Sequence, residues 1–230
     1  MKIYGLQKMT LLDYPGHVAC TVFLNGCDFR CPFCHNYELA TGVATPIMDE
    51  DEVIAFLRKR TGLLDGVAIT GGEPCLSAGL SDFLRDIHSL GFLTKLDTNG
   101  YHPDILQHLM NENLIDYVAM DIKNSPEKYA LTAGIPSVDM AKITQSIDLL
   151  RNGTVDYEFR TTVVKELHED KDFEMIGKMI RGAKRYYLQQ FTDRDSVPFS
   201  NMSAPSLAQM EAFSAIVKKY VPETTLRGVE

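Results

Sequence analysis

The chain has 230 residues, of which 45% are hydrophobic and 23% charged. This is enough for one substantial core and excludes long disordered spans, so we expect a single domain over residues 1–230. The 31 acidic residues outnumber the 23 lysines and arginines, and the net charge of -8 argues against a nucleic-acid partner. No apolar run approaches membrane-spanning length, and the first ten residues lack a signal-peptide core, which favours a cytoplasmic protein without a membrane partner.

The first predicted strand leads directly into a cluster of cysteines. Residues 18–24 are apolar and β-branched, and turn residues on both sides bound them, which predicts a buried strand. Cys27, Cys31 and Cys34 follow within eight residues. Thiolates are soft ligands, and closely spaced cysteines can reach one iron-sulfur cluster without a large loop-closure cost. Because a 4Fe-4S cluster has four irons, three local ligands would leave one iron open to bind a small molecule.

Other uses of this cysteine pattern are less consistent with the rest of the chain. Residues 31–35 match the C-x-x-C-H haem attachment signal, but haem attachment expects an exported protein. A zinc site would need a second ligand pair, and the remaining cysteines, Cys20 and Cys75, stand alone. We expect both to be buried thiols, and we expect His35 to be a loop residue rather than a ligand.

Helices and strands alternate along the remainder of the chain. Asp49, with Glu52 three residues later, predicts a capped helix start. Further helices are predicted over residues 80–90, 103–111, 138–151, 170–183 and 207–220. Further strands are predicted over residues 66–70, 92–96, 115–120, 155–164 and 186–191. Residues 192–206 are polar and predicted to form a loop.

The six predicted strands favour a parallel sheet, since strands that alternate with helices form βαβ units. The unusual motifs all follow strands. The cysteine loop, Gly71-Gly72-Glu73-Pro74, Asp97-Thr98-Asn99-Gly100 and Asp121-Ile122-Lys123 each come at a different strand end. In parallel barrels this end carries the active site, whereas a doubly wound sheet gathers ligands at a switch point. We therefore predict an α/β fold, a partial (β/α)6 TIM-like barrel with a mostly parallel curved sheet.

The cysteine loop followed by a strand-end Gly-Gly-Glu-Pro strongly resembles the radical S-adenosylmethionine (radical SAM) enzymes, over nearly the whole chain. The resemblance implies a 4Fe-4S cluster on Cys27, Cys31 and Cys34, with S-adenosylmethionine bound to the open iron. It also implies that an electron from the cluster splits the sulfonium, and that the resulting 5′-deoxyadenosyl radical removes a hydrogen atom from the substrate.

The same resemblance implies roles for residues near the cysteines. Phe33 would pack on the adenine side of the cofactor, and Asn36 would contact the cofactor. In the motif that ends at Pro74, Gly71 and Gly72 would let the backbone approach a ligand, and Glu73 would accept a hydrogen bond from an ammonium group. Phe33 could instead anchor the loop in the core.

Charged and polar residues on three later strands would complete the cofactor site. Asp97, Thr98 and Asn99 would bind the cofactor or a monovalent cation near Asp97, although a turn-forming role is an equal alternative. Asp121 and Lys123 lie two residues apart on one side of a strand, as a cofactor contact or as a buried ion pair.

A lone charge in a strand also needs a partner. Arg160 lies mid-strand, where an unpaired charge is costly, so we expect it to meet Asp121, Glu73 or the cofactor carboxylate.

Within the superfamily, the chain most resembles the glycyl-radical activating enzymes, through the segments 34–36, 96–100 and 120–123. Residues 5–8, 13–16 and 188–191 further resemble the activating protein of the anaerobic ribonucleoside-triphosphate reductase. This implies a glycyl-radical enzyme as protein substrate and reduced flavodoxin or ferredoxin as electron donor. A radical SAM enzyme acting on a small molecule, and a non-enzymatic iron-sulfur scaffold or sensor, stay open as alternatives.

Overall fold

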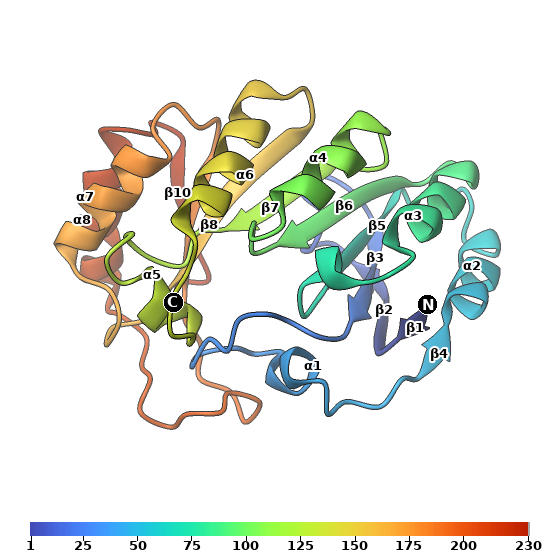
Figure 1. Cartoon of the computed structure of the whole chain (residues 1–230), viewed down its shortest axis with the longest axis horizontal. Helices are drawn as coiled ribbons and strands as arrows, with labels where there is room; N and C mark the ends of the chain where they lie inside the picture. Colours follow the sequence, from blue (N-terminus) through green and yellow to red (C-terminus); the bar gives the residue numbers. More distant parts are fainter. Residues whose placement is uncertain (230) are drawn as a thin grey trace.

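The computed structural model describes residues 1–229, and one curved sheet dominates it (Figure 1). The strand order in this sheet is β10-β9-β8-β7-β6-β5-β3-β2, in which β2 alone pairs antiparallel with its neighbour. Its strands are β2 (Gly5–Thr10), β3 (Ala19–Leu24), β5 (Gly66–Gly71), β6 (Leu93–Thr98), β7 (Tyr117–Asp121), β8 (Asp156–Val163), β9 (Tyr186–Gln190) and β10 (Thr224–Arg227). The sheet is open, with β2 and β10 at its two edges.

The six predicted strands are confirmed as β3 and β5 to β9, consecutive and parallel, and so is the open, mostly parallel barrel. Four strands were not predicted. The edge strands β2 and β10 are short or largely exposed, and β1 (Lys2–Ile3) and β4 (Met48–Asp49) form a separate two-residue pairing. Such strands lack the long apolar pattern that marks a buried strand.

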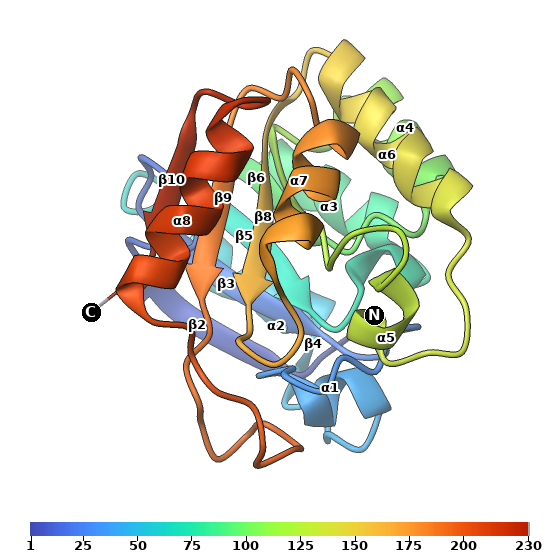
Figure 2. The same ribbon diagram turned by 90° about the vertical axis from the view of Figure 1, so that its left-hand side faces the viewer.

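Helices ring the sheet in Figure 1, from α2 round to α8, whereas α1 and the loop after β9 lie together on the lower side in both ribbon views (Figure 2). The helices are α1 (Tyr37–Thr41), α2 (Glu50–Arg58), α3 (Leu80–Ser89), α4 (Pro103–Asn111), α5 (Tyr129–Ala133), α6 (Met140–Asn152), α7 (Asp170–Met179) and α8 (Leu207–Lys218). The capping box of Asp49 and Glu52 is confirmed at the start of α2. The five-residue helices α1 and α5 were predicted as loop, because one turn carries little periodicity. Within residues 1–229, every helix is too short or too polar to cross a bilayer.

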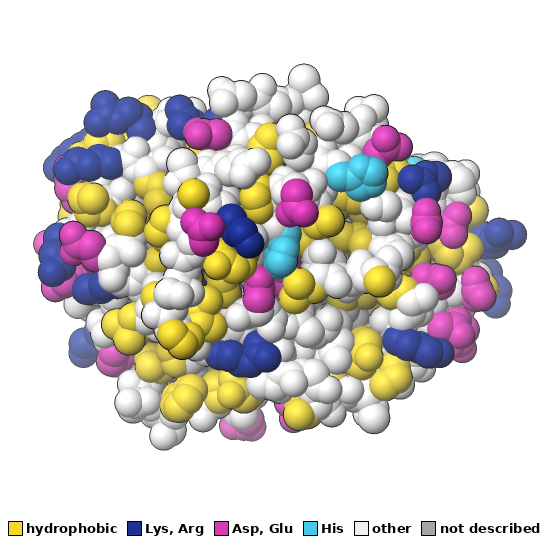
Figure 3. All heavy atoms as spheres, viewed as in Figure 1, with side chains coloured by type: hydrophobic (Ala, Val, Ile, Leu, Met, Phe, Trp, Pro, Cys, Tyr) yellow, Lys and Arg dark blue, Asp and Glu magenta, His cyan; other side chains and the backbone are white. Residues whose placement is uncertain are grey.

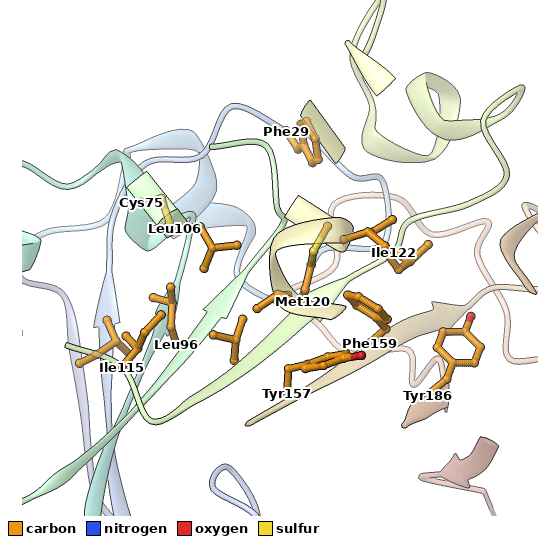
Figure 4. Packing of buried hydrophobic residues seen from close by; sticks show 14 of the residues in the cluster. Phe29, Cys75, Leu96, Leu106, Ile115, Met120, Ile122, Tyr157, Phe159 and Tyr186 are labelled. Atoms are coloured by element: carbon orange, nitrogen blue, oxygen red, sulfur yellow. The ribbon is translucent and has the colours of Figure 1, made fainter. Parts of the chain in front are cut away.

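The two faces of the central strands differ in chemistry. Leu96, Met120 and Phe159 are fully buried in the apolar core, and Figure 4 shows them on neighbouring strands. Because side chains alternate along a strand, the neighbouring positions Asp97 and Arg160 fall on the opposite face. The sheet thus buries one apolar face and collects charged groups on the other.

Candidate cluster and cofactor site

The cysteine loop, residues 27–34, follows β3 and carries three unpaired thiols. Burial raises the pKa of Cys27 to about 12 and that of Cys31 to about 11, so both thiols are protonated at neutral pH. Burial likewise raises the pKa of Cys34. In all three cases the positive charge of Lys123 acts in the opposite direction and lowers the thiol pKa. The charge of one ammonium group, that of Lys123, therefore acts on all three thiols.

The three thiols have the ligand chemistry of a 4Fe-4S cluster. Within residues 1–229, no three His, Cys, Asp or Glu side chains converge to hold one metal ion. In a 4Fe-4S cluster each cysteine binds a different iron, so its ligands surround a volume instead of meeting at a point. Three soft donors without a disulfide between them fit such a cluster.

Two neighbouring segments hold the residues between the cysteines in place. Asp28 accepts hydrogen bonds from His102 Nε2 at 2.8 Å and from Asn99 Nδ2 at 2.9 Å. Burial alone would raise the pKa of Asp28, but these two hydrogen bonds outweigh it and the pKa lies below its usual value. The Arg30 backbone N–H donates to the carbonyl of Ala133 at 2.8 Å. The sequence analysis missed Asp28 and His102. The only signal in the sequence was that Asp28 is a polar residue inside the cysteine loop.

Gly71 and Gly72 are required by contacts within the protein. A Cβ on Gly71 would lie 2.3 Å from the carbonyl oxygen of Leu24, and one on Gly72 would lie 2.0 Å from that of Gly26. Both contacts are with backbone, which cannot move aside as a flexible side chain would. The Gly72 N–H donates to Leu24 O at 2.9 Å. The glycines thus bring β5 against the start of the cysteine loop, a reason that differs from the ligand approach expected from the sequence.

Glu73 is 1% exposed and joins two of the predicted motifs. Its carboxylate accepts from the Cys75 N–H at 3.0 Å, from Thr98 Oγ1 at 2.9 Å and from the Asn99 N–H at 2.7 Å. Burial raises the pKa of Glu73 in spite of these three donors. Since both carboxylate oxygens are engaged inside the protein, the structure shows Glu73 as a group that positions Thr98 and Asn99.

Five charged residues on the polar face form what we call the charge network: Lys95, Asp97, Asp121, Lys123 and Arg160. Arg160 joins two strands through ion pairs with Asp121 and Asp97, and Asp121 was one of its expected partners. Burial alone would raise the pKa of Asp121, but Arg160 and Lys123 outweigh it and hold that pKa well below its usual range. Arg160 and Lys95 likewise hold the pKa of Asp97 below its usual value against the effect of burial. Both carboxylates are therefore charged at neutral pH.

The remaining predicted residues lie around the cysteine loop. Asn36 Nδ2 donates to the carbonyl of Gly71 at 3.0 Å, and Phe33 is buried. Pro74 begins a short 3-10 helix, residues 74–76, that also contains the buried Cys75.

His35 contacts the segment that directly follows β9. Its Nε2 donates to the carbonyl of Thr192 at 2.7 Å, and its ring stacks on Phe191. In the space-filling view, basic, acidic and histidine side chains gather near the middle of the molecular surface that faces the viewer (Figure 3).

The comparisons with known proteins agree with this geometry. The model of the radical SAM superfamily matches residues 21–180, and the chain belongs to that superfamily. Its members use a 4Fe-4S cluster and S-adenosylmethionine. More narrowly, the chain is homologous to glycyl-radical enzyme activating enzymes: it is 31% identical to a candidate activating enzyme of this kind from Methanocaldococcus jannaschii, over 99% of this chain and 96% of the relative.

Two further relatives extend the comparison. The pyruvate formate-lyase-activating enzyme of Listeria monocytogenes is 30% identical over 61% of this chain, which spans 62% of that enzyme. Among solved structures, Streptococcus suis SuiB bound to S-adenosylmethionine superposes with a TM-score of 0.69 at 14% identity, over 90% of this chain and 52% of SuiB. At that identity the structural similarity shows the fold alone. Taken with the sequence matches, the chain is a radical SAM enzyme.

Proposed function

We propose that this protein generates a glycyl radical on a partner enzyme, with a cluster held by Cys27, Cys31 and Cys34. The similarity to a candidate activating enzyme along 99% of the chain carries this proposal. When bound, the cluster supplies one electron for cleavage of the sulfonium of S-adenosylmethionine. The overall change consumes one S-adenosylmethionine and one electron, from reduced flavodoxin or ferredoxin, and yields methionine, 5′-deoxyadenosine and the glycyl radical, with the hydrogen atom of the glycine Cα transferred to 5′-deoxyadenosine.

The open sheet supports a protein substrate. Because β2 and β10 are both edges, the barrel is not closed, and we place the substrate loop at this unclosed side. The protein's own residues would orient the cofactor: Lys123 offers an ammonium beside the thiols, and Glu73 fixes the Asn99 backbone N–H. The Lys123 ammonium pairs with Asp121 at 2.8 Å and keeps further N–H donors that suit the cofactor carboxylate.

We further propose anaerobic ribonucleoside-triphosphate reductase as the partner, in the cytoplasm. The support is the resemblance of residues 5–8, 13–16 and 188–191 stated above. In the structure Asp13 accepts a hydrogen bond from Thr21 Oγ1 at 2.6 Å, and the Tyr14 ring is buried near Tyr117. These contacts give part of the resemblance a role in folding, so the partner must be identified by experiment.

The test is an anaerobic electron paramagnetic resonance (EPR) spectrum of the reconstituted, reduced protein with S-adenosylmethionine and a candidate reductase. We expect a persistent glycyl doublet that disappears when the partner glycine is replaced by alanine, and also when the protein carries Cys27→Ala. Cofactor cleavage without a doublet on any glycyl-radical enzyme would contradict the proposal.

A second candidate has its own support. The 7-carboxy-7-deazaguanine synthase of Hyperthermus butylicus is 36% identical over 39% of this chain. A radical SAM enzyme acting on a small molecule would cleave the cofactor with that substrate alone. Turnover without any protein partner would favour this reading.

A further inference from the structure

Every oxygen of the two carboxylates in the charge network has a basic nitrogen beside it. In Asp97, Oδ1 pairs with Lys95 Nζ, and Oδ2 lies 3.3 Å from Arg160 Nη2. In Asp121, Oδ1 lies 2.5 Å from Arg160 Nε, and Oδ2 lies 2.8 Å from Lys123 Nζ. Each of the four oxygens therefore faces a nitrogen of the protein itself.

We propose that Arg160 is the built-in cation of the cofactor site, and that the protein binds no sodium or potassium ion there. This proposal rests on the assignment of the polar face as the cofactor site, and it reverses the expectation of a monovalent cation near Asp97. Hard cations take oxygen ligands, and each oxygen that Asp97 and Asp121 would offer already lies beside a basic nitrogen of the protein.

Charge balance gives a second, independent reason. The network holds three basic groups and two carboxylates, so it carries a net charge of one positive unit before any ligand binds. A monovalent cation would raise this to two positive units in a partly buried region, where like charges repel more strongly than in water. The same surplus favours an anionic group, such as the carboxylate of the cofactor.

The chemistry of the side chain explains why arginine serves here. A guanidinium is always charged, and its fork of N–H donors can reach two carboxylates at once. Arg160 uses Nε toward Asp121 on β7 and Nη2 toward Asp97 on β6, while its own backbone lies on β8. It thus connects three strands. A metal ion could make the same connection only after it had been bound from solution, whereas Arg160 is part of the chain.

The test measures S-adenosylmethionine binding and thermal unfolding in buffers of equal ionic strength that contain potassium, sodium or tetramethylammonium. We expect the dissociation constant of the wild-type protein to agree within about twofold in all three buffers. A wild-type affinity that falls by about fivefold or more without alkali cations would overturn the proposal.

The variant Arg160→Gln removes the bridging charge and leaves Asp97 and Asp121 facing each other. In this variant we expect potassium, but not tetramethylammonium, to increase cofactor affinity by about fivefold and to raise the unfolding temperature. A variant insensitive to potassium would contradict the idea that Arg160 occupies a cation position. The control is Arg185→Gln, which removes an arginine paired with Asp156 at the other end of the strands and should behave like the wild type.

The wild-type measurement decides the proposal even if Arg160→Gln does not fold. Neither measurement involves a partner protein. A failed glycyl-radical assay would therefore leave this inference standing, and potassium dependence would leave the proposed activity standing.

Discussion

The cysteine loop and the charge network lie close together but are completed in different ways. In the charge network, every carboxylate oxygen already has a basic partner from the protein. In the cysteine loop, the three thiols are unpaired, and burial keeps those of Cys27 and Cys31 protonated at neutral pH. The ion pairs of the charge network form when the chain folds, whereas the thiols of the cysteine loop are the expected ligands of a cluster that the protein must bind.

This difference indicates which energy each region depends on. Ion pairs formed within the protein are present before any ligand arrives, so the charge network is preorganised. Thiols must lose their protons to bind iron, so assembly of the cluster releases protons and couples iron binding to the stability of the loop. Substitutions in the two regions should therefore have different signatures in iron content and cofactor affinity.

The largest expected effect comes from removing a thiol of the cysteine loop. For Cys27→Ala we expect iron content to fall sharply and cofactor cleavage to drop by at least about a hundredfold, because loss of a ligand exceeds the loss caused by changing a ligand's neighbour. Iron analysis and the amount of 5′-deoxyadenosine formed measure both effects.

The matched control for that variant is Cys75→Ala, which removes a buried thiol whose Sγ lies 3.8 Å from Thr98 Oγ1. This variant should keep most of its iron and activity. Equal losses in both variants would mean that the assignment of the three cluster ligands is wrong.

The next largest effect is expected from adding a methyl group at Gly72, where the end of β5 packs against the start of the cysteine loop. The Cβ of Gly72→Ala would lie 2.0 Å from the Gly26 carbonyl oxygen, so the loop must shift. We expect a stability loss of about 3 kcal/mol, the upper range for an overpacked site, together with lower iron content. Urea unfolding of the iron-free protein separates the two effects.

Gly79→Ala provides the comparison for that experiment. A Cβ at this position meets nothing within 4 Å, but the backbone is left-handed, with φ at +86°. Its cost should be about 1 kcal/mol of conformational strain, with unchanged iron content. If both alanine variants lose iron equally, the contact with Gly26 is not what positions the loop.

The sequence could predict the parallel strands and the strand ends at which the candidate site lies. The strands β3 and β5 to β9 are apolar runs between turn signals, and the motifs at their ends follow from chain order alone. One partner of Arg160, Asp121, was also predicted, since a mid-strand charge needs a carboxylate, whereas its second partner, Asp97, was not.

The contacts between distant segments could not be predicted in the same way. The pairing of Asp28 with His102 joins residues 74 positions apart, and no local pattern encodes it. The hydrogen bonds of Glu73 to Thr98 and Asn99 were not predicted for the same reason, because these donors come from another strand end. The edge strand β10 was missed because its partner, not its own composition, makes it a strand.

A substitution in the charge network should affect the cofactor and spare the cluster. For Lys123→Ala we expect S-adenosylmethionine to bind about tenfold more weakly, corresponding to about 1.4 kcal/mol, because the charge network loses one of its three basic groups and with it the positive surplus that favours the cofactor carboxylate. Iron content should stay at the wild-type level. Calorimetry on the reconstituted protein measures the affinity.

The control removes a lysine that lies in another ion-pair cluster. Lys128 pairs with Glu169 and Asp172, and Lys128→Ala should leave cofactor affinity unchanged. Unchanged affinity in Lys123→Ala as well would assign Lys123 to a structural ion pair with Asp121.

The smallest effect is expected at His35, which follows Cys34 in sequence and contacts Thr192 and Phe191. His35→Ala removes a hydrogen bond to the Thr192 carbonyl and a stacking contact with Phe191. Because this contact is partly exposed, the expected cost is about 1 kcal/mol of stability.

Iron content and the EPR spectrum of the reduced cluster should be unchanged in His35→Ala. His17→Ala, which removes a histidine packed on Tyr14 in the turn between β2 and β3, controls for the loss of a ring. If His35→Ala alone alters the EPR spectrum or lowers the iron content, then His35 acts on the cluster. His35 would then belong with the cysteine loop, whose chemistry depends on iron, and not with the contacts that folding alone provides.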